Sequence, residues 1–130
     1  MTVGKIKEIA LYQTANDIED IDDFETVLQP YFDEGYDMAV HAYAGVHPGM
    51  DDEFPVLTRD DEVPAVPEWL HVKLADWMSW RILADGAPAR QQRGMVFRQS
   101  FELALNQIRS GEGKGNQPSG PWKFVNIPRR

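Results

Sequence analysis

The amino-acid sequence predicts an all-α fold: a four-helix bundle-like domain with a long acidic loop and an extended C-terminal arm. In four separate segments, apolar residues recur at spacings of three and four, which places them on one face of a helix. Clusters of proline, glycine and acidic residues separate these segments, at points where helices normally end. We therefore expect a helical domain over residues 1–110, followed by a flexible tether and docking arm over residues 111–130.

The first two helices are expected at residues 3–15 and 23–45. The first has apolar residues at helical spacing, namely Val3, Ile6, Ile9 and Ala10. The second has the best-defined apolar stripe in the chain, over about six turns. Pro30 should kink or restart this helix, because proline lacks an N–H donor and clashes with the preceding turn. Gly45 is in the right place to end it.

Residues 46–66 are expected to form the long acidic loop. The segment reads "VHPGMDDEFPVLTRDDEVPAV", with three prolines and six acidic residues. Within it, "FPVLT" at residues 54–58 is a candidate short strand, because it is apolar and β-branched. A loop of this length without structure of its own is uncommon in a compact domain and is often functional.

The third and fourth helices are expected at residues 67–86 and 88–109. A proline begins the third helix and a glycine ends it, which is the usual order. Apolar residues lie on more than one side of this helix, so it should contact neighbours on two sides; Trp69, Val72 and Trp80 lie outside the main stripe. The stripe of the fourth helix consists of Phe97, Phe101, Ala104, Leu105 and Ile108.

The sequence contains no constellation that points to catalysis, a cofactor or a metal ion. There are no cysteines, which excludes a thiol nucleophile, a disulfide framework and a cysteine-based zinc site. The glycine-rich "GEGKGNQPSG" lacks the spacing of a nucleotide-binding loop. His41, His47 and His71 form no metal-binding string, although Asp37 and His41 share a helix face. We therefore expect no enzyme, no cofactor and no metal.

Charge is unevenly distributed along the chain. Residues 1–65 hold 16 acidic and three basic residues, a formal charge of −13, whereas residues 66–130 hold five acidic and ten basic residues, a charge of +5. Such a split is typical of a molecule that meets copies of itself or a partner end to end, or of acids that gather in loops and helix starts. No apolar run approaches the roughly 20 residues that span a membrane, so no membrane partner is expected.

Several segments resemble the head–tail connector (adaptor) proteins of tailed bacteriophages. Pro-Glu-Trp-Leu at residues 67–70 begins a helix that ends in an arginine-bearing turn, and a glycine-containing break leads to a helix with "FELAL" at residues 101–105. Upstream, "VLQPYFDEGYDMAVHAY" at residues 27–43 is similar to the first long helix of that family. The resemblance covers roughly residues 22–110.

The resemblance implies a structural virion protein in a ring between portal and tail, a homo-dodecamer in the virion neck that resides in the host cytoplasm before assembly. The implied partners are the portal protein, neighbouring connector subunits and tail or stopper proteins, while DNA passes through the channel without specific binding. The alternative from a different class is an acidic protein-binding module, such as a DNA-mimic inhibitor. That function would need acids on one exposed helix face at phosphate-like spacing.

The C-terminal arm is the predicted partner-binding site. An apolar and basic sequence follows a glycine-rich tether, and the residues expected to bind a partner are Trp122, Lys123, Phe124, Val125, Ile127, Arg129 and Arg130. In an extended segment, alternate residues point to opposite sides, and here both sides carry apolar groups. The arm is therefore expected either to bind another chain or to fold back onto its own domain.

Overall fold

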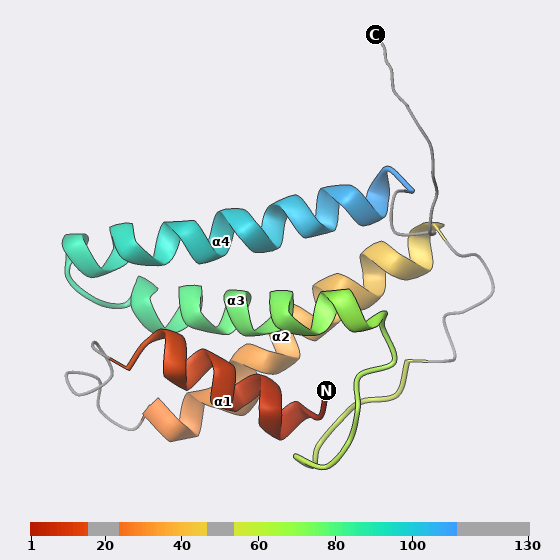
Figure 1. The fold of residues 1–130 in the computed structure, drawn as a ribbon, viewed down its shortest axis with the longest axis horizontal. Coiled ribbons are helices and arrows are strands. Elements are labelled where there is room, and N and C mark those ends of the chain that lie inside the picture. The colour runs from red at the N-terminus through yellow and green to blue at the C-terminus, as the bar shows by residue number, and fades with distance from the viewer. Residues whose placement is uncertain (16–23, 47–53, 112–130) are drawn as a thin grey trace, which may run out of the picture.

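The computed structural model describes residues 1–15, 24–46 and 54–111, and within them the protein is all-α, as the sequence predicts. The helices are α1 (Val3–Gln13), α2 (Phe24–Val46), α3 (Glu68–Ala84) and α4 (Pro88–Arg109) (Figure 1). Their order and approximate bounds match the four segments with helical periodicity.

Helix α3 is the centre of the fold. It packs against α1, α2 and α4, and α4 packs in addition against α2. Figure 1 shows α4 running alongside α3 in the opposite direction, after the short turn that joins them. The prediction that this helix has contacts on two sides is confirmed, because α1 and α2 also pack against it.

The core contains the apolar stripes of all four helices. Its largest fully buried apolar side chains are Ile6, Phe32, Leu70, Leu74, Met78, Leu83, Phe101 and Ile108. The predicted stripe of α4 is buried from Phe101 onward, whereas Phe97 is half-buried. Burial of such side chains contributes about 1.5–3 kcal/mol each, so this core accounts for much of the stability of the domain.

Pro30 lies inside α2, and the helix continues through it to Val46. Of the two outcomes expected at Pro30, a kink or a restart, the restart is therefore wrong, and so is the expectation that Gly45 ends the helix. A proline removes a hydrogen bond of the helix. On both sides of Pro30, however, Leu28, Tyr31 and Phe32 are buried in the core. Packing of this stripe holds the helix together across the proline.

The predicted strand at residues 54–58 is not a strand. A strand needs a second strand for its backbone hydrogen bonds, whereas this segment lies beside α2. The Gln29 side chain of α2 donates from Nε2 to the Leu57 carbonyl at 3.1 Å, and Leu57 is buried. We call residues 54–67, which lead from this contact into α3, the strap.

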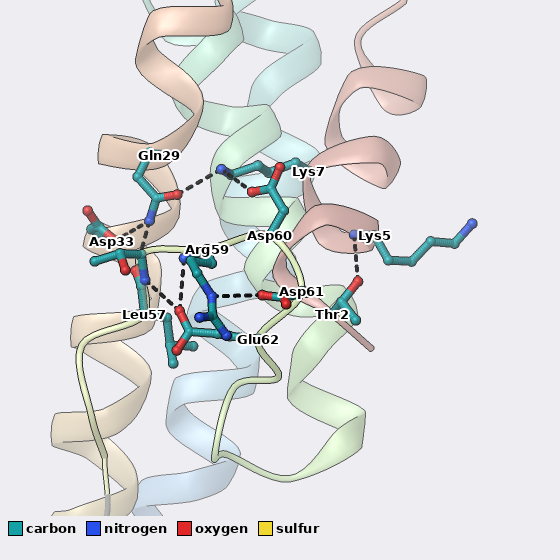
Figure 2. Close-up of polar contacts among 11 residues, drawn as sticks. Thr2, Lys5, Lys7, Gln29, Asp33, Leu57, Arg59, Asp60, Asp61 and Glu62 are labelled. Carbon is teal, nitrogen blue, oxygen red and sulfur yellow. Dashed lines mark hydrogen bonds and ion pairs between the residues drawn. The ribbon is translucent and has the colours of Figure 1, made fainter.

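The strap also caps the first turn of α1. The amides of Val3 and Gly4 donate to the carbonyls of Glu62 and Asp60, at 2.8 and 2.9 Å. The first amides of a helix have no partner within it, and here the strap supplies acceptors for them. Lys7 of α1 donates from Nζ to Asp60 Oδ1 at 2.8 Å and to Gln29 Oε1 at 2.7 Å (Figure 2). The strap therefore ties α1 to α2.

A single carboxylate stabilises the turn within the strap. Glu62 Oε1 accepts hydrogen bonds from the backbone amides of Thr58 and Arg59, at 2.9 and 2.8 Å (Figure 2). These two bonds favour the charged form, and they lower the pKa of Glu62 below its usual value. The acidic residues of this part of the loop are thus partly structural.

Candidate functional site

The predicted docking arm, Trp122, Lys123, Phe124, Val125, Ile127, Arg129 and Arg130, lies outside the described residues. Its role in binding a partner stays a prediction of the sequence. The described residues do contain a surface feature that the sequence did not predict, which lies along the exposed side of α2.

Two adjoining hollows follow α2, and they share Glu34 and Asp37. The first has a volume of about 440 Å³ and lies between α2 and the start of the strap; it is lined by Pro30, Asp33, Glu34, Tyr36, Asp37, Val40, Phe54, Pro55, Val56 and Leu57. The second, of about 550 Å³, is lined by Glu34, Asp37, Met38, Trp77, Trp80, Arg81 and Arg98. We call the two hollows together the acidic groove.

Helical spacing on α2 places three carboxylates along this groove. Asp33, Glu34 and Asp37 are exposed, whereas Phe32 and Tyr36 face the core. The two sets of residues alternate because a helix turns about 100° per residue. A helix that is tied to the core by one stripe therefore presents its acids together on the opposite side.

Gly35 allows α3 to approach α2 closely beneath the groove. A Cβ at position 35 would lie 3.1 Å from Trp77 Cδ1 and 3.3 Å from Trp77 Cβ. These distances are tighter than ordinary van der Waals contact. Although glycine lowers helix propensity, at this position it makes room for the indole that lines the second hollow.

Glu34 is held by groups from α3. It accepts from Arg81 Nε at 2.8 Å and from Trp77 Nε1 at 3.2 Å through the same oxygen. The Arg81 guanidinium also lies over the Tyr31 ring, 4.6 Å from its centroid. The hydrogen bond to Glu34 raises the pKa of Arg81. Glu34 therefore serves mainly to join α2 to α3.

Asp33 and Asp37 have weaker partners than Glu34. Asp33 accepts from the neutral side-chain amide of Gln29 at 2.9 Å. Asp37 Oδ1 lies 3.4 Å from His41 Nδ1, in a pair whose side chains are both more than two-thirds exposed. Because a carboxylate can accept several hydrogen bonds, both groups retain acceptor capacity toward solvent.

Between the carboxylates and the strap, the lining of the first hollow is mainly apolar. Val40 and Leu57 lie in it, and Phe54 makes an edge contact with Tyr43 at a centroid distance of 5.9 Å. Val56 stands at its edge with 81% of its surface exposed. An apolar lining with carboxylates beside it suits a ligand that combines apolar and cationic groups.

The histidines that the sequence singled out are separated in the fold. His41 is exposed on α2, whereas His71 is buried on α3 between the Met1 amine and the Val66 carbonyl, at 3.1 and 3.0 Å. His47 lies outside the described residues. Within the described ranges, no group of three or more acidic or histidine side chains is arranged to hold a metal ion.

Comparison with protein-family models, with curated proteins and with solved structures gives no match to this chain. Among residues 1–15, 24–46 and 54–111, no helix is both long and apolar enough to cross a bilayer.

Proposed function

We propose that this chain is a structural assembly protein, a subunit of the ring that connects head and tail in a tailed bacteriophage. One observation carries the proposal: α4 ends at Arg109, and the sequence after it joins a glycine-rich tether to an apolar, basic arm. Apolar side chains gain free energy only when they are buried, so an apolar, basic segment behind a flexible tether is typical of a docking element. The arm is suited to fasten the subunit to another protein.

The all-α fold and the distribution of charge support this role. The excess of acids in residues 1–65 and of bases in residues 66–130 favours contacts between oppositely charged segments of successive copies. Such contacts generate a closed ring when the rotation between copies closes. In this proposal the partners are the portal protein, neighbouring subunits and tail or stopper proteins, and the ring is a dodecamer through which DNA passes.

The energetics of the arm favour an assembly that uses many arms together. Burial of Trp122, Phe124, Val125 and Ile127 contributes roughly 6–12 kcal/mol in total. Ordering of the nine residues 122–130, at about 1–2 kcal/mol each, costs roughly 9–18 kcal/mol, which is at least as large as that gain. A single arm therefore binds weakly, whereas a ring of arms binds strongly because each arm acts at a high effective concentration.

The alternative, a DNA-mimic inhibitor, has less support. Asp33, Glu34 and Asp37 do lie on one exposed side of α2. However, Arg81 pairs with Glu34, and Arg98 lines the same hollow. These cations interrupt the row of negative charge that a phosphate-like surface requires.

Electron microscopy of the purified protein, and of particles that contain it, tests the proposal. We expect rings of the full chain, and we expect deletion of residues 111–130 to leave a folded helical domain that no longer joins particles. A full-length variant, Trp122→Ala with Phe124→Ala, should lose attachment as well. Its matched control is Lys114→Ala with Asn116→Ala, which alters the tether alone and should attach normally.

Two outcomes would overturn the proposal. Normal incorporation of the deleted chain into particles would show that the arm is not the fastener. A protein that stays monomeric and binds no phage structural protein would exclude the role in a connector ring.

A further inference from the structure

We propose that the acidic groove is a docking surface for an apolar, basic peptide, and that its occupant in the free subunit is the C-terminal segment of the same molecule, residues 121–130. The groove is a surface feature that the packing of the described residues leaves unexplained, and the segment is the apolar, basic sequence that follows α4 and the tether. This inference does not depend on the connector assignment, because it concerns the chain before it meets any partner.

The chemistry of the two parts is complementary. The segment "PWKFVNIPRR" contains two aromatic and two β-branched residues and three cations. The first hollow of the groove has an apolar lining formed in part by Val40, Phe54 and Leu57, with Asp33 and Asp37 beside it. Arg81 and Arg98 line the second hollow and offset its acids, so the cations of the segment are expected at the first hollow. A hollow of about 440 Å³ lies within the usual range for binding sites, and it can admit a large side chain.

The length of the tether permits docking within one molecule. Residues 111–121 reach about 35 Å when extended and about 18 Å as a random coil. Helix α4 packs against α2, and the C-terminal ends of both helices lie at the same end of the molecule (Figure 1). From Val46, at that end, to Val40 in the groove, the helix rises about 9 Å. The segment therefore has enough chain to reach the groove of its own subunit.

Effective concentration favours the segment's own groove over that of another copy. A short flexible tether holds the segment at a millimolar effective concentration near its own domain, above the concentration of a second molecule in a micromolar solution. Because the cost of ordering the segment offsets the gain from apolar burial, the contact is weak and reversible. A weak internal contact of this kind shields the apolar residues and still yields to a partner.

Disulfide trapping in the full chain tests the proposal, since the protein contains no native cysteine. The variant Val56→Cys with Asn126→Cys places one thiol beside the groove and one in the segment. The control, Val96→Cys with Asn126→Cys, places the first thiol on α4, where Val96 is 66% exposed and lies outside the groove. At about 5 µM protein, far below the tether's effective concentration, we expect the intrachain bond to form at least about fivefold faster than in the control.

A second pair of variants tests the role of charge. Asp33→Lys with Asp37→Lys, added to the trapping variant, should lower the rate to that of the control. Glu8→Lys with Glu68→Lys changes the net charge equally at exposed sites outside the groove and should leave the rate unchanged. A synthetic peptide of residues 121–130 should slow trapping by competition, and circular dichroism verifies that each variant is folded.

Equal rates in the Val56 and Val96 variants would overturn the proposal. Disulfides formed mainly between chains, at a rate that rises with protein concentration, would overturn the choice of occupant and assign the groove to a second copy. Insensitivity to the lysine substitutions at Asp33 and Asp37 would show that the carboxylates do not recognise the segment. None of these results would test the proposal that the protein forms a connector ring, which is tested separately by electron microscopy.

Discussion

Asp76 on α3 and Asp37 on α2 are the same residue type in opposite settings. Asp76 is only 6% exposed and accepts hydrogen bonds from Gln13 Nε2 at 3.1 Å and from Ser100 Oγ at 2.9 Å. The Asp37 side chain is 71% exposed, and that of its neighbour His41 is 77% exposed. One carboxylate organises the packing of helices, whereas the other is available at a surface. Charge in the sequence alone does not distinguish these roles.

The network around Asp76 explains why polar groups are tolerated at the centre of the fold. Ser79 donates from Oγ to Gln13 Oε1 at 2.6 Å, and Lys73 donates from Nζ to Ser100 Oγ at 2.8 Å. The network joins α1, α3 and α4 and satisfies the buried groups, as burial of polar atoms requires. On α2, Asp33 and Asp37 belong to no comparable buried network, so their carboxylates remain accessible to a ligand.

The largest effect is expected from a cavity in the central helix. Leu74→Ala should lower the free energy of unfolding by about 2–5 kcal/mol, because Leu74 is 1% exposed and its removal leaves a void. Chemical denaturation followed by circular dichroism measures the change. Val72→Ala on the same helix, at an exposed position, should change stability by less than about 1 kcal/mol. Similar losses for both would contradict the central position of α3.

The two aspartates provide the next test. Asp76→Ala should cost about 1–3 kcal/mol, because it leaves Gln13 and Ser100 without their acceptor. Asp37→Ala should remain within about 0.5 kcal/mol of the parent, as expected for an exposed residue. The same denaturation measurement applies to both variants. A large loss of stability from Asp37→Ala would show that α2 depends on this acid for stability, and it would contradict the difference proposed between Asp76 and Asp37.

Alanine substitutions at two glycines of α2 should change the stability of the protein in opposite directions. Gly45→Ala meets no atom within 4 Å, so it should stabilise the protein by up to about 1 kcal/mol through helix propensity. At Gly35 the added methyl group meets Trp77, and overpacking of about 1–3 kcal/mol outweighs that gain. Thermal unfolding compares the two variants. A stabilising Gly35→Ala would show that the Trp77 ring moves freely.

The smallest expected effect is the pH dependence contributed by Glu62 in the strap. Backbone amides lower its pKa in the folded state, so its contribution to stability is present above its unfolded pKa and is lost as pH falls through the folded value. The difference in unfolding free energy between the parent and Glu62→Gln should therefore shrink as pH falls below about 4.5. A difference that stays constant across this range would show that the carboxylate does not hold the turn.

The helices could be predicted because helix formation depends mainly on residues that are close together in the sequence. The spacing of apolar residues identified all four segments, and the proline at position 88 with the stripe up to Ile108 set the bounds of α4 closely. The strand expected at residues 54–58 was wrong because the described residues offer no partner strand; instead α2 binds the segment through Gln29, and Leu57 is buried. The restart expected at Pro30 was wrong because the packing of its neighbours outweighs one lost hydrogen bond.

By itself, the sequence determined the all-α class, the order of the helices and the helix faces that enter the core, since these follow from residues three and four positions apart. Only the tertiary structure decided that the strap lies against α2 and caps α1, that Asp76 is buried, and that Asp33 and Asp37 border a groove. Those features arise from contacts between residues far apart in the chain, which local periodicity does not record. The acidic groove is therefore a product of packing.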